Sequence, residues 1–259
     1  MQKTLTVTII QADLHWENPV ANRTQFSEKI KNISGKTDLI VLPEMFTTGF
    51  TMNAEKLSEE DNGETLQWMI SEAKKNNAAI TGSIIISENN TFYNRLFFVF
   101  PNGTYKIYDK RHTFTLAGED KTYTAGTQRL IVDYKGFKIC PLICYDLRFP
   151  VWARNTENYD LLLYVANWPV KRIVAWDVLL KARAIENMSY CIGVNRVGLD
   201  GTGHEYTGHS AVYDVLGNCI STPNFEKELI ETVVLEKEHI DTHRKHLQFL
   251  NDRDHFNLN

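Results

Sequence analysis

Three segments of the chain each place a reactive side chain directly after an apolar, strand-like run. In folds that combine sheets and helices, functional groups gather at the ends of strands. An acid, an ammonium and a thiol at three strand ends therefore predict a nucleophilic site. The residues are Glu44, Lys110 and Cys144, and the runs before them are 39–43, 105–109 and 139–143.

The chemistry of such a site follows from the ionisation of its thiol. A cysteine with a pKa of about 8.5 is mostly protonated at neutral pH, so it needs a base to become a nucleophile. The Glu44 carboxylate can take the proton of Cys144 and later pass it to a leaving amine. The Lys110 ammonium and the backbone N–H of Tyr145 can stabilise a developing oxyanion. These groups together predict acyl transfer through a cysteine thioester.

Each of these residues taken alone has another interpretation. Cys144 by itself is typical of a buried structural thiol, because free cysteine is among the most buried residue types. Glu44 alone could be an acid at a helix start or in a loop, and Lys110 alone is typical of a solvated surface. The combination of the three residues favours catalysis.

The three segments, read as motifs, resemble the nitrilase or carbon–nitrogen hydrolase superfamily over about residues 3–236. The resemblance implies that Glu44 is the general base, Lys110 the catalytic lysine and Cys144 the nucleophile. It also implies a four-layer αββα sandwich, which usually pairs through its helices into a homodimer. The motifs are Leu42-Pro43-Glu44 with Gly49-Phe50, Tyr108-Asp109-Lys110-Arg111-His112, and Ile143-Cys144-Tyr145-Asp146-Leu147-Arg148-Phe149-Pro150.

A second glutamate near the site is also implied by the resemblance, where it orients the lysine and shapes the pocket. The best match in this sequence is Glu119, within Leu116-Ala117-Gly118-Glu119-Asp120. The neighbouring Asp120 makes this alignment less specific, and a solvated loop acid is the alternative interpretation of Glu119.

The helices and strands expected to position these residues indicate an α+β chain. Turn signals at 101–104, 135–136 and 216–218 require antiparallel strand pairs, which favours two mixed sheets with helices on both outer faces. A single doubly wound sheet is the simpler alternative. The apolar pattern predicts one domain over residues 1–259, with a polar C-terminal arm from about 237 to 259. Helices are expected at 19–34, 63–76 and 173–188.

Within the superfamily, the sequence is similar to the ω-amidase branch in its bacterial form. The chain shows no long C-terminal extension of the kind found in nitrile-specific members, and no fused synthetase domain. The resemblance implies hydrolysis of the terminal amide of α-keto acid amides such as 2-oxoglutaramate, with release of ammonia. The matching stretches are Tyr164-Val165-Ala166-Asn167-Trp168-Pro169 with Arg172, Ala182-Arg183-Ala184-Ile185-Glu186-Asn187, and Asn195-Arg196-Val197-Gly198.

A small amide with a distal carboxylate needs a cation at the far end of its pocket. Arg148 and Arg172 are candidates, since a guanidinium can hold a carboxylate through two hydrogen bonds. Trp168 and Phe46 are expected to wall the pocket. The alternatives are an ion pair between Arg148 and Asp146, a solvated helix start for Arg172, and core packing for Trp168.

Composition narrows the class of protein further. The chain has 28 Lys and Arg against 32 Asp and Glu, a net charge of −4, which disfavours a nucleic-acid surface. Its apolar runs fall short of the roughly 20 residues of a membrane-spanning helix. Four cysteines in apolar runs indicate reduced thiols and a cytoplasmic setting. No cofactor and no metal site are expected, because the glycine-flanked His204 and His209 suit a loop.

Two other functions stay open at this point. One is a neighbouring activity within the superfamily, such as an N-carbamoyl-amine or aliphatic-amide hydrolase. The other is a catalytically silent binding protein of the same fold. The presence of an acid, a lysine and a cysteine at the three motif positions disfavours the silent protein.

Overall fold

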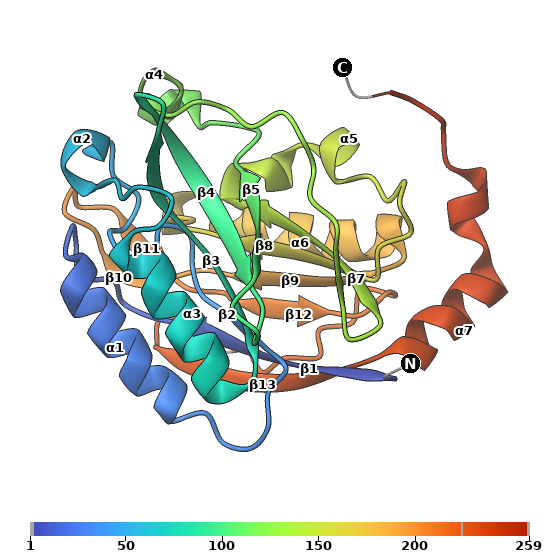
Figure 1. Ribbon diagram of the computed structural model, residues 1–259. Coiled ribbons are helices and arrows are strands. Elements are labelled where there is room, and N and C mark those ends of the chain that lie inside the picture. Colours follow the sequence, from blue (N-terminus) through green and yellow to red (C-terminus); the bar gives the residue numbers. More distant parts are fainter. Residues whose placement is uncertain (1–2, 224, 258–259) are drawn as a thin grey trace.

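The computed structural model describes residues 3–223 and 225–257, and two facing sheets with helices outside them make up four layers (Figure 1). This arrangement confirms the expected α+β architecture with two mixed sheets. The six-stranded sheet has the order β13-β1-β2-β3-β4-β5. Its strands are Leu229–Glu236, Thr4–Gln11, Leu39–Val41, Ala79–Glu88, Thr91–Val99 and Tyr105–Asp109.

The second sheet has five strands in the order β12-β9-β8-β7-β6. Its three central strands are parallel and apolar on both faces, as expected for strands covered on each side. Its strands are Ala211–Tyr213, Tyr190–Val194, Leu161–Val165, Phe137–Ile143 and Val132–Tyr134. A separate pair, β10 (Val197–Leu199) and β11 (Glu205–Thr207), forms a short antiparallel ribbon.

Helices cover the outer face of each sheet. On the six-stranded sheet, α1 (Pro19–Lys31) and α3 (Glu64–Asn76) bury Phe26 and Met69 against the strands. On the other sheet, α6 (Ile173–Asn187) buries Trp176 against β9. The short helices are α2 (Ala54–Leu57), α4 (Glu119–Thr122), α5 (Pro150–Ala153), and the 3-10 turns η1 (Thr115–Ala117), η2 (Cys144–Arg148), η3 (Val170–Arg172) and η4 (Phe249–Asp252).

The segment expected as a C-terminal arm contains the helix α7 (Lys237–Leu247). Its Ile240 is buried in the largest hydrophobic cluster, and the Arg244 Nε donates to the Met188 carbonyl at 2.8 Å. This helix therefore packs on the body of the protein. No helix in the described part of the chain is both long and apolar enough to cross a membrane.

A buried carboxylate joins the two sheets beside the predicted site. Asp146 accepts hydrogen bonds at Oδ2 from the Tyr108 hydroxyl (2.7 Å) and the Ile143 N–H (3.0 Å). Its Oδ1 accepts from the His112 N–H at 3.0 Å and lies 2.8 Å from His112 Nδ1. Tyr108 belongs to β5 of the first sheet and Ile143 to β7 of the second. Asp146 therefore holds the segments that carry Lys110 and Cys144 in a fixed relative position.

We expect Asp146→Asn to lower the free energy of unfolding by about 2 kcal/mol. The carboxylate of Asp146 accepts hydrogen bonds at two oxygens, whereas the amide of asparagine has only one acceptor oxygen. Urea denaturation measures this change. The matched control is Asp133→Asn, on the exposed side of β6, which should leave the free energy of unfolding nearly unchanged. Equal stabilities of the two variants would show that Asp146 does not hold the sheets together.

Candidate active site

The three predicted residues lie at the same end of the two sheets. Glu44 follows β2, Lys110 follows β5, and Cys144 follows β7 and begins η2. The residue after Glu44, Met45, and Cys144 itself have φ angles of 42° and 44°, in a region that non-glycine residues rarely adopt. At both positions the chain turns sharply as it leaves the strand. Such outliers are found most often at functional sites.

Lys110 lies between two carboxylates, all of them buried. Its Nζ is 2.9 Å from Glu44 Oε1 and 2.9 Å from both oxygens of Glu119. The Asn94 side-chain amide donates to Glu44 Oε1 at 2.8 Å, and the Asn167 N–H donates to Glu44 Oε2 at 2.8 Å. Both Glu44 oxygens are thus occupied and fixed in direction.

Burial and these charges set the ionisation of the site. Burial lowers the pKa of Lys110, but the charges of Glu119 and Glu44 outweigh it, so the pKa rises and the ammonium is permanent. Burial raises the pKa of the Cys144 thiol well above its usual value, and the charge of Glu44 raises it further. Burial also raises the pKa of Glu119 against the effect of Lys110. The resting cysteine is therefore a thiol, and its Sγ donates to the Asn167 carbonyl at 3.9 Å.

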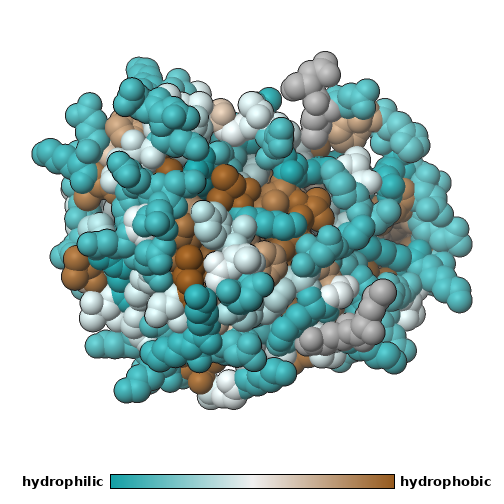
Figure 2. All heavy atoms as spheres, in the orientation of Figure 1, coloured by the Kyte–Doolittle hydropathy of each residue, from teal (hydrophilic) through white to brown (hydrophobic). Residues whose placement is uncertain are grey.

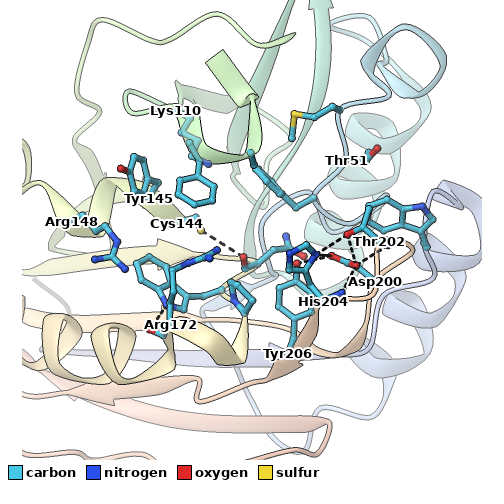
Figure 3. Close-up of a pocket in the computed structure, with 18 residues that line it drawn as sticks. Thr51, Lys110, Cys144, Tyr145, Arg148, Arg172, Asp200, Thr202, His204 and Tyr206 are labelled. Carbon is cyan, nitrogen blue, oxygen red and sulfur yellow. Dashed lines mark hydrogen bonds and ion pairs between the residues drawn. The ribbon is translucent and has the colours of Figure 1, made fainter. Parts of the chain in front are cut away.

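The thiol opens into a cavity of about 350 Å³ (Figure 3). The part of the surface shown in Figure 2 is mostly hydrophilic, with hydrophobic side chains gathered near its centre. The cavity combines aromatic walls with a few polar and charged groups, as small-molecule sites do. Its lining consists of Trp16, Phe50, Thr51, Met52, Lys110, Phe114, Ala117, Cys144, Tyr145, Arg148, Asn167, Trp168, Pro169, Arg172, Asp200, Thr202, His204 and Tyr206.

Both candidate arginines line this cavity. The Arg148 guanidinium lies over the Trp168 ring, 5.0 Å from its centroid, and the Arg172 guanidinium lies 4.9 Å from the centroid of Phe114. Among the described residues, neither guanidinium has a carboxylate within 4.0 Å. The alternative of an ion pair between Arg148 and Asp146 is therefore not what the structure contains. Two cations remain available to an anionic ligand.

Tyr145 and Trp168 also lie where the sequence predicts, on the cavity wall. The Trp168 indole Nε1 donates to the Arg172 carbonyl at 2.8 Å and so fixes the ring that lies under Arg148. The prediction for Phe46 is wrong. Its side chain is fully buried on the outer face of the first sheet, with its ring 5.5 Å from that of Phe26 and 5.7 Å from that of Trp68.

Several residues of the site were not predicted from the sequence. Asn94 is a polar residue at a buried strand position, a signal that could have marked it as a partner of the glutamates. Asp200, Thr202 and Tyr206 come from the β10–β11 ribbon and its turn, where no periodic pattern indicates which side chains face a cavity. His204 was weighed only as a metal ligand, and it lines the cavity instead.

The arrangement can support acyl transfer in chemical terms. It offers a thiol with a carboxylate as base, a permanent ammonium beside it, and a cavity with aromatic walls. The guanidinium groups add a place for a negative charge away from the thiol.

Comparison with known proteins agrees with this geometry. The chain is 43% identical to the omega-amidase YafV of Escherichia coli over 256 residues, which cover 98% of each chain. It is 32% identical to the 2-oxoglutaramate amidase of Bacillus subtilis over 234 residues, 88% of this chain and 90% of that protein. A crystal structure of a CN-hydrolase superfamily protein from Xanthomonas campestris, with an arsenic adduct in its active site, matches with a TM-score of 0.96, at 39% identity over 99% of both chains.

Residues 6–241 match the carbon–nitrogen hydrolase family. This match covers both sheets and all four motif residues, Glu44, Lys110, Glu119 and Cys144. The chain belongs to the carbon–nitrogen hydrolase family.

Proposed function

We propose that the protein is an ω-amidase, which hydrolyses the terminal amide of small α-keto acid amides of the 2-oxoglutaramate type to a carboxylate and ammonia. The observation that carries the proposal is the pair of guanidinium groups that have no carboxylate partner within the described residues and lie in the same cavity as the Cys144 thiol. The similarity to relatives named omega-amidase and 2-oxoglutaramate amidase supports the same substrate class.

In the proposed acylation step, Cys144 Sγ attacks the amide carbon while Glu44 takes the thiol proton. Lys110 Nζ and the Tyr145 N–H stabilise the oxyanion of the tetrahedral intermediate. Glu44 then protonates the amide nitrogen, the carbon–nitrogen bond breaks, and ammonia leaves a thioester on Cys144. Glu119 positions Lys110, and this role is supported by the 2.9 Å distances from both Glu119 oxygens to Lys110 Nζ.

In the deacylation step, a water molecule attacks the thioester carbon and Glu44 takes its proton. The carbon–sulfur bond then breaks, the product carboxylic acid leaves, and the thiolate recovers its proton from Glu44. No proton is gained or lost by the protein over the cycle.

The proposal includes a small-molecule substrate, a cytoplasmic setting and a homodimer formed by one domain. A reduced nucleophile suits a reducing compartment, and the four cysteines are free. The dimer is supported by exposed apolar side chains on α6, namely Val174, Val178 and Ile185, which would be covered by a second copy.

A neighbouring activity on N-carbamoyl amines or neutral aliphatic amides is the second candidate within the same chemistry. Ammonia release from a panel of carboxylate-bearing ω-amides, neutral amides and carbamoyl amines distinguishes the two. Preference for neutral amides or carbamoyl amines would contradict the ω-amidase proposal, and failure to release ammonia from any of them would favour a silent binding protein.

We expect Cys144→Ala and Cys144→Ser to abolish turnover while the protein stays folded. The thiol is the nucleophile, and a hydroxyl is far less acidic, so Glu44 cannot activate it in the same way. Steady-state ammonia release measures turnover, and thermal unfolding is the control for the fold. A Cys144→Ser variant within tenfold of the wild-type rate would rule out the covalent mechanism.

Glu44→Gln and Lys110→Met should each lower kcat/KM by about 10²–10⁴-fold, because one loses the proton carrier and the other the oxyanion cation. The double variant should be little worse than either single variant, since the groups act as one unit. The measurement is a double-mutant cycle in kcat/KM. Strictly additive losses would mean that the two residues act in separate sites.

Arg148→Met and Arg172→Met test the recognition of the substrate carboxylate. Removal of one partner of a desolvated charge pair costs about 2–5 kcal/mol, so kcat/KM for a carboxylate-bearing ω-amide should fall by orders of magnitude. A neutral amide of similar size should change far less, because it never uses the contact. Equal losses for both substrates would assign that arginine a structural role.

A further inference from the structure

The turn between β10 and β11 forms a wall of the cavity that lies across from Arg148 (Figure 3). It carries Asp200, Thr202 and His204, and Tyr206 follows on β11. The proposed chemistry uses none of them. Their hydrogen bonds nevertheless fix which atom of His204 is left for a ligand.

Asp200 is the centre of the turn. Its Oδ1 accepts from the Thr202 N–H at 2.8 Å, the Thr202 hydroxyl at 2.7 Å and the His204 N–H at 2.9 Å. Its Oδ2 accepts from the Tyr206 hydroxyl at 2.8 Å. Burial raises the pKa of Asp200, but these hydrogen bonds outweigh it and the pKa is lowered. Asp200 is therefore an ionised group that only accepts hydrogen bonds.

This ionisation determines the tautomer of His204. The Thr202 hydroxyl has one hydrogen, and it is donated to Asp200. The distance of 2.8 Å between Thr202 Oγ1 and His204 Nδ1 must then be a hydrogen bond that Nδ1 donates. In neutral His204 the proton is thus on Nδ1 and the lone pair on Nε2. Within the described part of the chain, Nε2 has no hydrogen-bond partner.

The His204 ring lies beside a carboxylate and is partly exposed. Its Nδ1 is 3.7 Å from Oδ2 of the ionised Asp200, and its side chain is 49% exposed. Arg172 lines the same cavity from η3. The titratable and charged groups around it are Asp200, Glu205 and Tyr206 on its own turn and strand, Arg172 on η3, and the Arg196–Asp13 pair behind Tyr206.

We propose that His204, in its imidazolium form, is a recognition residue for the anionic end of the substrate and acts beside Arg172. Protonation of Nε2 adds a hydrogen-bond donor and a positive charge to a cavity that already holds two fixed guanidinium groups. A carboxylate, or a carboxylate with an adjoining 2-oxo group, accepts from such donors. The inference rests on the proposed function, because it explains how the cavity would select a negatively charged ω-amide.

The test compares one anionic and one neutral amide over pH. For each pH between about 5.5 and 8, the ratio of kcat/KM for 2-oxoglutaramate to kcat/KM for butanamide is measured, so that ionisations shared by both reactions cancel. In the wild type this ratio should fall roughly tenfold as His204 loses its proton. In His204→Gln the ratio should be independent of pH and close to the high-pH value of the wild type.

Glu205→Gln is the matched control. It is the next residue in the chain and exposed, it does not line the cavity, and it should keep the wild-type pH dependence. The melting temperature of His204→Gln, compared with that of the wild type, verifies that the turn remains folded. The same pH dependence in the wild type and in His204→Gln would overturn the proposal.

A binding measurement keeps the inference separate from the proposed function. The measurement uses Cys144→Ala, which binds ligand without turnover. The His204 C2–H signal is assigned by NMR because it is lost in the Cys144→Ala/His204→Gln double variant. Its chemical shift is then followed over pH with and without 2-oxoglutarate. Linkage requires that a ligand which prefers the imidazolium raises the pKa of His204. If the wild type hydrolyses no ω-amide, the proposed function fails, whereas an unchanged titration in the presence of bound 2-oxoglutarate shows that the His204 inference fails.

Discussion

The site depends on an ammonium group held out of water between two carboxylates. Removing such charges from water costs several kcal/mol for each ion, and only close partners with all remaining hydrogen bonds satisfied offset that cost. Glu44 and Glu119 meet the requirement because their oxygens also accept hydrogen bonds from Asn94, from the Asn167 N–H and from the Phe114 N–H. These partners come from separate strands and loops. The ammonium of Lys110 can therefore stay charged in the interior only if the strands of the first sheet keep their register and the first sheet packs on the second.

The thiol and the arginines obey a different constraint. Burial raises the pKa of Cys144, so in the mechanism we propose the thiolate forms only when Glu44 takes the thiol proton during attack. A permanent thiolate beside Glu44 and Glu119 would bring a third negative charge to one buried cation. The arginines stay open for a ligand since each is held by an aromatic ring, which supports a guanidinium without occupying its N–H groups.

The sequence predicts well what local patterns determine. Apolar runs that end in Glu44, Lys110 and Cys144 indicate both the strands and their functional ends, and the two-sheet fold and the family are confirmed. The prediction for Phe46 failed because the chain reverses at Met45. The φ of 42° at Met45 directs the next side chain to the outer face of the first sheet. His204 was misjudged because the role of a turn residue depends on which wall of the cavity the turn forms. That is a long-range property, and no periodicity reports it.

The pairing of β1 with β13 has a consequence for the order of events during synthesis. The side-chain hydrogen bond between Thr8 and Thr232 joins positions 224 residues apart, and the register runs from Thr4 with Glu236 to Gln11 with Leu229. A ribosome releases β13 only after nearly all other elements, so until then β1 has an open edge. Contacts of such long range also slow folding. The nascent chain therefore keeps an unpaired strand edge on β1 until β13 is released and pairs with it.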